Sequence, residues 1–422
     1  MAFFFTVGIT HAVGTKMKYK TIIIGAGAAG MMTGIAAGSH GAKDVLILNA
    51  TPRIGLKILM SGGGRCNITN AELQYQKFYG ESKNAIKKII KQFPPQKVID
   101  FFESQGVKTK IEKPWFKYFP VDNKAQSVLN ALLKKLDTLN IKIKFPVIVE
   151  DFFAEENGIW KVIAGDKEYS CENLVLASGG FSYPHTGSDG KLWPKLVKMG
   201  VQIEKDIPAL TPLKTDNRLF HKLKGLSLQC NLQVKKQQKV IQEECNSLLF
   251  THFGLSGPGI LNVSHNFACN NPNIKLYANF LPDHQRTVFE QDLMQLPHNT
   301  KIVNVLGKFF QRRLAETLTS MSCPIEQTAG QMTKIQRKNV LKNVFEQQFN
   351  ITGTLGYKKA EITSGGIPFS QLNLKTMEMK NYPRLYAVGE IVNVHGDIGG
   401  YNFQWAWSSG WVCGKAIASI AL

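Results

Sequence analysis

The chain has 422 residues, 44% of them hydrophobic and 19% charged, which is enough for two or three folded domains and excludes a disordered protein. Lys and Arg number 51 against 31 Asp and Glu, a formal net charge of +20. This excess could attract nucleic acid or another anionic partner, but the lysines are scattered at helix-like and strand-like spacing. We therefore interpret them as solvated faces and expect no nucleic-acid partner.

The seven cysteines are an odd number without a Cys-x-x-Cys pair, which favours a reducing, cytoplasmic location. Neither the cysteines nor the nine histidines show zinc spacing, so no metal is expected. Residues 1–16 lack the charged segment and the cleavage site of a signal peptide and are predicted to be an N-terminal extension. The uncharged stretch of residues 21–39 contains five glycines, so we interpret it as a strand, a turn and a helix and expect no membrane insertion.

The first predicted elements are a strand over residues 19–24, a helix over 31–39 and a second strand over 44–48. Gly25, Gly27 and Gly30 form a GxGxxG motif between the strand and the helix. Gly25 permits the tight turn, Gly27 lets the backbone approach a pyrophosphate, and Gly30 allows close packing of the helix. The unit therefore predicts a dinucleotide site of the Rossmann type, with the phosphates at the helix N-terminus.

Asn49 stands at the end of the second strand, where an acidic residue would accept hydrogen bonds from the ribose hydroxyls. Its amide oxygen can still accept, but without the charge of a carboxylate. We therefore expect a weaker ribose contact, and we expect Asn49→Glu to tighten cofactor binding by roughly 1 kcal/mol, the scale of one improved hydrogen bond.

A glycine-rich block, GLKILMSGGGRCNITN, occupies residues 55–70. Gly62, Gly63 and Gly64 would let backbone N–H groups face a ligand, while Lys57 and Arg65 could neutralise a phosphate or bind a substrate anion. This block is therefore a second candidate segment of the binding site.

The rest of the chain alternates between helical and strand patterns. Helices are predicted over residues 83–92, 96–105, 125–139, 283–320, 334–348 and 404–420. Alternating apolar residues predict a strand meander over 141–149, 158–164 and 172–180, and an antiparallel β module over 201–270.

Together with the blocks LVLASGGFSYPHTGSDG, LLFTHFGLSGPGILNVS and LYAVGEIVNVHGDIGGYNFQWAWSSG, the motif KILMSGGGRCNITN resembles the BaiN/RdsA family of FAD-dependent oxidoreductases, which includes aminoacetone oxidase-like proteins. The resemblance covers nearly all of the chain after Met17. It implies an α/β fold with a Rossmann-like FAD-binding domain of the two-dinucleotide-binding-domain class, an inserted β-barrel-like domain and a small helical domain. The expected bounds are 17–200 and 350–422 for the FAD domain, 201–280 and 335–349 for the β-barrel-like domain, and 281–334 for the helical domain.

The family pattern also implies which residues contact FAD. They lie near the glycine motifs at both chain ends and after the middle strands, and fall on Gly25, Gly27, Ala28, Gly30, Asn49, Lys57, Gly64, Arg65, Asn67, Val147, Ala177, Ser178, Gly179, Gly389, Glu390, Asp397, Gly399, Gly400, Tyr401 and Asn402. Asn49 departs from the Glu usual in the family, and Asn393 and His395 depart from its acidic residues, which bears on FAD affinity or flavin potential. Gly399 and Gly400 open the last predicted helix, whose N-terminus would stabilise an anionic reduced flavin.

The resemblance implies hydride transfer between the flavin and a small organic substrate, with NAD(P)H as a transient donor. We expect no dedicated NAD(P)H domain, because the chain has one GxGxxG motif in a strand–helix context and GLSGPG at residues 254–259 has the wrong spacing. An oxygen-using amine (aminoketone) oxidase is the alternative. An RNA-binding or RNA-modifying flavoprotein is less favoured, because no RNA-binding motif is present.

The candidate catalytic residues near the substrate are Cys66, Tyr183, His185, His395 and Tyr401. Each also has a structural interpretation: a packed thiol for the cysteine, aromatic wall for the tyrosines and turn residues for the histidines. The sequence therefore assigns no catalytic acid or base, and it leaves the oligomeric state open.

Overall fold

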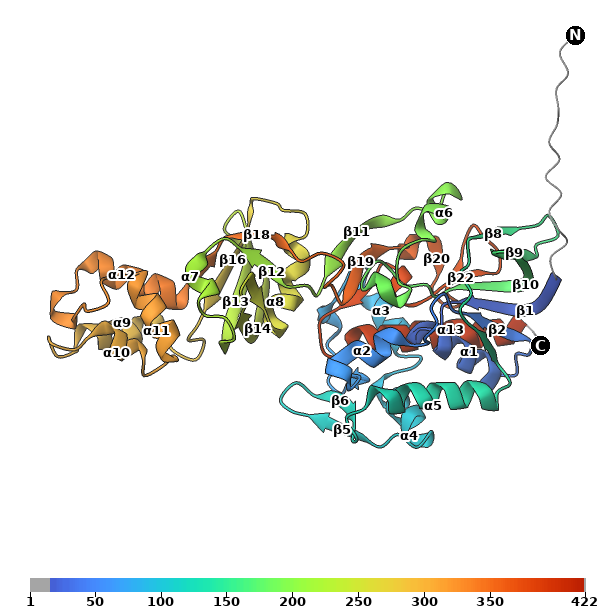
Figure 1. Cartoon of the computed structure of the whole chain (residues 1–422), viewed down its shortest axis with the longest axis horizontal. Helices are drawn as coiled ribbons and strands as arrows, with labels where there is room; N and C mark the ends of the chain where they lie inside the picture. The colour runs from blue at the N-terminus through green and yellow to red at the C-terminus, as the bar shows by residue number, and fades with distance from the viewer. Residues whose placement is uncertain (1–15, 421–422) are drawn as a thin grey trace, which may run out of the picture. The chain divides into compact units, whose positions relative to one another are not determined.

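The computed structural model describes residues 16–420 (Figure 1). It divides into two compact units: the first contains the chain up to Asp206 together with Ser364–Leu422, and the second is Ile207–Thr363. The predicted extension, residues 1–16, lies outside the described residues except for Lys16, which begins the first strand. Within the described residues, no helix combines the length and the apolar composition needed to cross a membrane.

The centre of the first unit is a parallel sheet with the strand order β22-β10-β1-β2-β7. Its strands are β1 (Lys16–Ile24), β2 (Val45–Leu48), β7 (Lys142–Lys144), β10 (Lys167–Leu176) and β22 (Leu385–Ala387). Antiparallel neighbours extend it: β20 (Leu372–Asn373) and β21 (Glu378–Met379) beside β22, and β8 (Asp151–Ala154) and β9 (Trp160–Ala164) beside β10. Apolar runs such as VLIL in β2 are wholly buried, as expected for strands covered on both faces.

One predicted strand pairs differently from expectation. The sequence predicts that residues 141–149 begin a meander, whereas β7 joins β2 in parallel and the meander consists of β8, β9 and β10. The chain reaches β7 through the helix α5 (Ala125–Thr138), and a helical crossover is the connection that parallel pairing requires. Alternation of apolar residues alone does not distinguish the two pairings.

The order of the strands creates a topological switch point between β1 and β10. From β1 the chain continues to β2 and β7 on one side, and later to β10 and β22 on the other side. In such sheets ligands bind beyond the carboxyl ends of the strands where the order reverses. β1 ends at Ile24 and β10 at Leu176, so Gly25 and Ala177 lie at this point.

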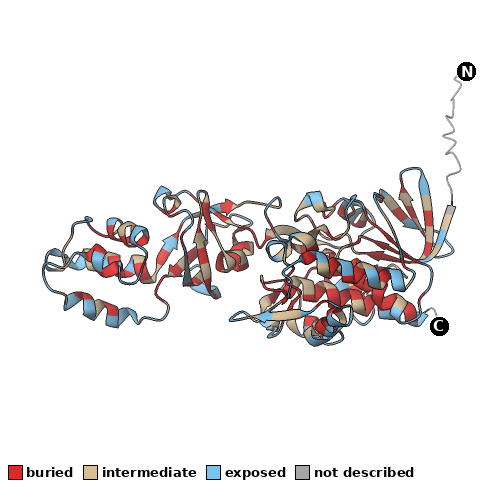
Figure 2. Ribbon diagram, turned by 60° about the horizontal axis from the view of Figure 1, so that its bottom comes forward, coloured by how far each residue is buried: buried red, intermediate tan, exposed pale blue. Residues whose placement is uncertain are grey.

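Two helices from opposite ends of the chain pack against each other. They are α1 (Ala28–Ser39) and α13 (Tyr401–Ile420), side by side in Figure 1, and Figure 2 shows buried residues along both. A Cβ on Gly410 would lie 2.5 Å from the carbonyl oxygen of Ala29, and one on Gly414 would overlap that of Thr33. Glycine at these two positions lets the backbones touch, so the last helix becomes part of the layer begun by the first.

Smaller elements complete the first unit. The helices are α2 (Leu56–Gly64), α3 (Lys83–Ile90), α4 (Pro95–Ser104) and α6 (Trp193–Lys198), with short 3-10 turns η1 (Tyr75–Lys77), η2 (Pro184–Thr186), η5 (Phe369–Gln371) and η6 (Gly389–Ile391). Two small antiparallel sheets are formed by β3 (Thr69–Asn70), β6 (Lys117–Pro120) and β5 (Thr109–Glu112), and by β4 (Phe78–Tyr79) and β23 (His395–Gly396).

The second unit is built on an antiparallel sheet with the order β17-β16-β13-β14-β15-β12-β18. Its strands are β12 (Leu213–Thr215), β13 (Ser227–Lys236), β14 (Lys239–Phe250), β15 (Gly254–Ser256), β16 (Ile274–Asn279), β17 (Gln347–Phe349) and β18 (Ile351–Thr354). Its helices are α7 (Arg218–His221), α8 (Pro258–Val263), α9 (Arg286–Met294), α10 (Ile302–Leu306), α11 (Arg312–Ser320) and α12 (Lys334–Phe345), with η3 (Ser264–Phe267) and η4 (Ala329–Gln331).

The limits of this unit differ from those expected near residues 200 and 350. The chain passes between the units in β11 (Glu204–Ala209) and returns in β19 (Ile362–Gly366). β18 follows residue 350 but pairs with β12, which places it in the second unit. One hydrophobic core runs from sheet residues such as Leu232 to helical residues such as Leu314, so the predicted helical segment 281–334 shares its core with the sheet.

Candidate functional site

The GxGxxG turn brings the backbones of β1, β10 and α1 into contact. Gly25 has φ +113°, and its N–H donates to the carbonyl of Leu48 at 2.8 Å. A Cβ on Gly25 would overlap the carbonyl oxygen of Ala177, and one on Gly30 would overlap that of Gly25. Packing within the protein therefore requires glycine at positions 25 and 30.

Gly27 is different, because it borders open space. A Cβ at this position would meet no atom of the described residues within 4 Å beyond its immediate neighbours. Gly27 is also the residue before α1, so this space lies in front of the unpaired N–H groups of the helix. An anionic pyrophosphate fits such a place, and the turn therefore fits a dinucleotide cofactor such as FAD.

The glycine-rich block forms the unwound end of α2. Gly62, Gly63 and Gly64 have φ of +57°, +68° and +84°, and Ser61 is extended with ψ 150°. A Cβ on Gly63 would meet no atom of the described residues within 4 Å beyond its neighbours. The predicted loop is therefore a left-handed turn that follows the helical residues of α2. Like Gly27, it borders open space.

Asn49 is buried and uses both ends of its side-chain amide within the protein. Its Oδ1 accepts from the N–H of Ala26 at 3.3 Å, inside the GxGxxG turn. Its Nδ2 donates to the carbonyl of Thr51 at 2.8 Å and to that of Arg53 at 3.3 Å. The amide therefore ties the turn to the segment after β2, and a carboxylate could not make the donor half of these contacts.

A polar network joins the ends of β10 and β22. The Nζ of Lys57, in α2, lies 2.5 Å from Oε2 of Glu390 in η6, and donates to Ser182 Oγ at 2.7 Å and Ser188 Oγ at 2.9 Å. Ser182 in turn donates to Oε1 of Glu390 at 2.6 Å. The Glu390 side chain is only 11% exposed, so its charge is held by these partners rather than by water.

The sequence singles out Lys57 and Glu390 but not the two serines. The pattern that could have indicated the serines is the block GFSYPHTGSDG, where two small hydroxyl residues flank a turn directly after a buried strand. Serine is common in turns, however, so this pattern does not reveal a partner more than 120 positions away, as the separations of 125 and 131 residues to Lys57 show.

The start of α13 is held by asparagine side chains. Gly399 and Gly400 have φ of +119° and +96°. Asn402 accepts from the N–H of Gly396 at 2.8 Å and donates to its carbonyl at 2.9 Å. The amide of Asn67, oriented so that both ends are satisfied, accepts from the N–H of Gly400 at 3.0 Å. Both asparagines thus shape the loop before α13.

The other predicted cofactor residues lie on these same segments. Val147 follows β7 and donates its N–H to the carbonyl of Asn49 at 2.8 Å. Asp397 is buried, and its N–H donates to the carbonyl of Lys77 at 3.0 Å. Arg65 lies beside the β5–β6 hairpin, where its guanidinium is 4.1 Å from the ring centroid of Phe119. Ala28, Ser178, Gly179 and Gly389 continue the chain at the ends of β1, β10 and β22.

The candidate catalytic residues divide by burial. Cys66 is fully buried, and burial raises the pKa of its thiol to about 12. Tyr401 is buried, and its hydroxyl accepts from the N–H of Gln74 at 3.3 Å. His395 is buried and stacks on Tyr79 with ring centroids 5.1 Å apart.

His185 is exposed and Tyr183 half-buried, with their rings edge to face at 5.9 Å. Tyr183 has φ +50°, a left-handed conformation that a tyrosine rarely adopts. These two residues therefore lie together on the loop after β10, where solvent reaches them, while Cys66, His395 and Tyr401 are packed inside.

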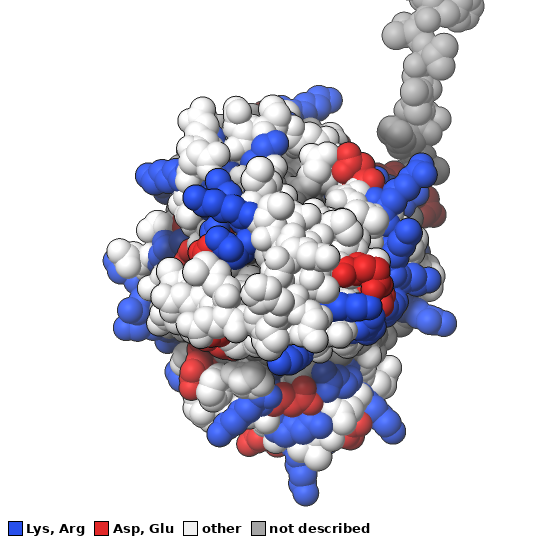
Figure 3. Space-filling view, turned by 90° about the vertical axis from the view of Figure 1, so that its left-hand side faces the viewer, with Lys and Arg blue, Asp and Glu red and all other residues white. Residues whose placement is uncertain are grey.

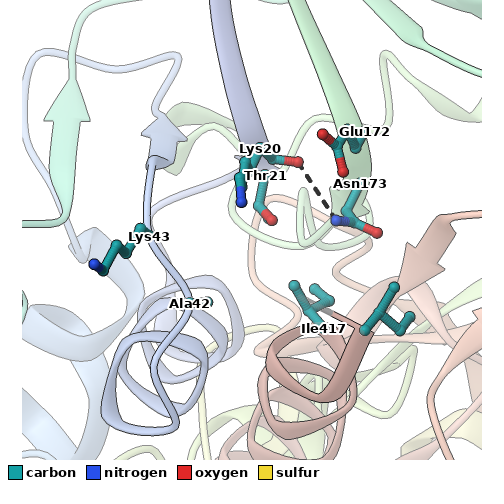
Figure 4. A pocket seen from close by; sticks show the side chains of 8 residues that line it. Lys20, Thr21, Ala42, Lys43, Glu172, Asn173 and Ile417 are labelled. Atoms are coloured by element: carbon teal, nitrogen blue, oxygen red, sulfur yellow. Dashed lines mark hydrogen bonds between the residues drawn. The ribbon is translucent and has the colours of Figure 1, made fainter. Parts of the chain in front are cut away.

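A pocket lies at the opposite end of the sheet (Figure 4). Asn173 in β10 donates to the carbonyl of Lys20 in β1 at 3.4 Å, Lys43 stands before β2, and Ile417 lies near the end of α13. These positions precede the carboxyl ends of the strands. The pocket is therefore separate from the switch point and from the glycine turns.

Known proteins resemble this chain over most of its length. The family model described as HI0933-like protein Rossmann domain matches residues 19–416. The ribosomal RNA dihydrouridine synthase of Escherichia coli is 31% identical over 399 residues, which cover 94% of this chain and 98% of that protein. The 3-dehydro-bile acid delta(4,6)-reductase of Clostridium scindens is 30% identical over 406 residues, with the same coverage of each chain.

Two solved structures share the fold. The E. coli quinol fumarate reductase FrdA has a TM-score of 0.53 at 13% identity and covers 96% of this chain and 71% of its own. The 3-ketosteroid-delta4-(5alpha)-dehydrogenase of Rhodococcus jostii has a TM-score of 0.50 at 15% identity and covers 97% of this chain and 99% of its own. The fold is thus an FAD-binding, Rossmann-like α/β fold, and the chain belongs to the HI0933-like family of flavin-dependent oxidoreductases.

Proposed function

We propose that the chain is an FAD-dependent reductase that saturates a carbon–carbon double bond conjugated to a carbonyl group, and that its substrate is uridine in RNA. The two named activities share this chemistry: dihydrouridine is uridine with its ring double bond reduced, and a bile acid delta(4,6)-reductase is named for reducing ring double bonds. The proposed reaction adds one hydride and one proton across the double bond.

The first unit supplies the binding site. The GxGxxG turn offers the space at Gly27 for the pyrophosphate, and the network of Lys57 and Glu390 fixes the loop after β10 beside it. Bound FAD would supply the hydride chemistry, with NADH or NADPH as the source of electrons. Cys66, His395 and Tyr401 are poor proton donors here because all three are buried, which leaves Tyr183, the exposed His185 or water.

The net charge of +20 is the observation that favours RNA over a neutral ring compound. The net charge alone predicts only solvated faces. However, two relatives that align with most of the chain are named ribosomal RNA dihydrouridine synthases. Figure 3 shows, on the face that carries α9 to α12, Lys and Arg side chains interspersed with Asp and Glu side chains and with uncharged surface. The excess of basic residues over the whole chain is what would attract a polyanion.

The test is an anaerobic reaction of the purified yellow protein with NADPH and two substrates in parallel: an RNA transcript rich in uridine, and a steroid enone. The proposal predicts that RNA reoxidises the reduced flavin, so that the yellow colour returns. Mass spectrometry should show that uridines of the RNA have gained two hydrogens. Turnover of the enone alone would show that the substrate class is wrong. A separate aerobic reaction with aminoacetone completes the test, and turnover there, with turnover of neither other substrate, would establish the oxidase alternative instead.

A further inference from the structure

The β5–β6 hairpin is a two-stranded ribbon with a charged face. Lys110 pairs with Phe119 and Glu112 with Lys117 across the two strands. Directly opposed residues in an antiparallel pair share a face, so Lys110, Glu112, Lys117 and Phe119 lie together. Figure 1 shows the hairpin projecting from the body of the first unit.

This face is turned towards the start of α13. The side-chain amide of Asn70 donates to the carbonyls of both Trp115 and Gly399, at 3.0 Å each. The Cε of Lys117 lies 3.4 Å from where a Cβ of Gly399 would be. On the other side, the ring of Phe119 is 3.0 Å from the equivalent point at Gly62. The hairpin therefore stands between the glycine-rich end of α2 and the loop before α13.

The hairpin and its two flanking residues combine exposed apolar and basic side chains. Trp115 is 37% exposed, Ile111 44% and Val121 50%. Residues 108–117 contain four lysines and one acid, Glu112. Glu112 contacts Arg65 at 2.8 Å and Lys110 at 3.7 Å, and with four lysines against this one acid the segment keeps a net positive charge.

An exposed aromatic ring among lysines is the composition with which proteins bind single-stranded nucleic acid, because the ring stacks on a base and the ammonium groups neutralise phosphates. A single exposed apolar residue would need no explanation, but here a tryptophan and three lysines occupy one ribbon beside the proposed flavin site. The same ribbon is anchored on β3 by the pairs Thr69 with Tyr118 and Asn70 with Lys117, so its position is fixed.

We infer that the β5–β6 hairpin binds the RNA strand next to the base that is reduced: Trp115 stacks on a neighbouring base, and Lys110, Lys113 and Lys117 contact the phosphates of the same strand. This inference rests on the proposed RNA substrate. It assigns recognition to a segment of the first unit, within reach of the cofactor-binding loops, rather than to the overall charge.

The experiment measures binding of a fluorescent, single-stranded, uridine-containing oligonucleotide by anisotropy over a range of salt concentrations, with FAD-loaded protein. Trp115→Ala should weaken binding roughly tenfold, the effect of losing one stacked base. A triple Lys110, Lys113 and Lys117 to Gln variant should reduce the slope of log K against log salt by about 2, since each phosphate contact on a single strand contributes roughly 0.7.

The matched controls carry the same changes far from the hairpin. They are Phe153→Ala, at a side chain 44% exposed in β8, and a triple change to Gln at the exposed Lys43, Lys142 and Lys167. Flavin absorbance and melting temperature of every variant verify folding. The inference is supported if the control variants bind the oligonucleotide as wild type does while the hairpin variants bind it more weakly.

Three results would overturn it. If hairpin variants bind RNA with the affinity and salt slope of wild type while the reaction on RNA proceeds, the hairpin is not the contact although the proposed function stands. If hairpin and control lysine variants lose the same salt slope, the attraction is general and not local. If wild-type protein binds no RNA at physiological salt, both the proposed substrate and the hairpin inference fall.

Discussion

Replacement of Asn49 tests how the site accommodates the loss of the acidic residue usual at the ribose position. Asn49→Asp keeps the size and shape of the side chain but exchanges its NH2 group for a second oxygen. In the structure that NH2 group faces the carbonyls of Thr51 and Arg53, at 2.8 and 3.3 Å, and Asn49 is buried. The new oxygen would therefore face two acceptors without a proton to share.

The expected cost follows from the unsatisfied groups. Leaving one buried acceptor without its donor costs about 1–3 kcal/mol, and the 3.3 Å contact is the weaker of the two, so we expect Asn49→Asp to lower the free energy of unfolding by about 2 kcal/mol. FAD affinity should fall too, because repulsion from the carbonyls of Thr51 and Arg53 would displace the side chain that holds the GxGxxG turn through the N–H of Ala26. This reverses the expectation from sequence alone that a carboxylate at this position tightens FAD.

The assay is urea denaturation of the apoprotein combined with titration by FAD, for wild type, Asn49→Asp and Asn49→Glu. Asn123→Asp, at an exposed asparagine, makes the same change of charge and should leave both quantities unchanged. If either carboxylate variant binds FAD more tightly than wild type without loss of stability, the hydrogen bonds at Thr51 and Arg53 are dispensable and our reasoning is refuted.

Gly27→Val should abolish FAD binding without loss of folding, because its side chain would enter the space before α1; a yellow variant would contradict this. Lys57→Met should destabilise the protein by roughly 2 kcal/mol in urea denaturation, since it strands the carboxylate of Glu390, and converting Glu390 to Met as well should restore part of the loss. Cys66 should resist iodoacetamide at neutral pH while the exposed Cys245 reacts, which mass spectrometry of the digest would show. Because burial raises the pKa of Cys66 from 9.0 to about 12, its contribution to stability is complete below pH 9 and is lost as the pH rises towards 12, so the urea midpoint should fall over that range; a flat midpoint would contradict the assignment.

The parts of the fold that could be predicted are those with local signals. The βαβ unit around Gly25 and the last helix were recognisable because glycine spacing and apolar periodicity act over a few residues. The parallel pairing of β7 was missed, because it depends on the crossover through α5 rather than on the strand's own residues. The end of the second unit after β18 was missed for a similar reason, since its pairing with β12 joins distant segments.

At the candidate site, the sequence names residues but does not show which of them contact each other. The sequence names Lys57 and Glu390, but their hydrogen bonds with Ser182 and Ser188 depend on three segments meeting in space. Asn49 was identified as a departure from the motif, and its hydrogen bonds in the structure lead us to expect the opposite effect of a carboxylate from the one that the sequence alone predicts. The sequence shows that a carboxylate is absent at position 49. The structure shows that the amide of Asn49 donates instead to the carbonyls of Thr51 and Arg53.

The cofactor residues also explain why a long insertion between them is tolerated. All of those predicted from the sequence lie in the first unit, before Asp206 or after Ser364, although the two groups are separated by the whole second unit. What joins them is the parallel pairing of β10 with β22 and the glycine contact of α13 with α1, neither of which involves a residue of the second unit. The second unit has its own buried core, so changes inside it can leave the turn at Gly27 undisturbed.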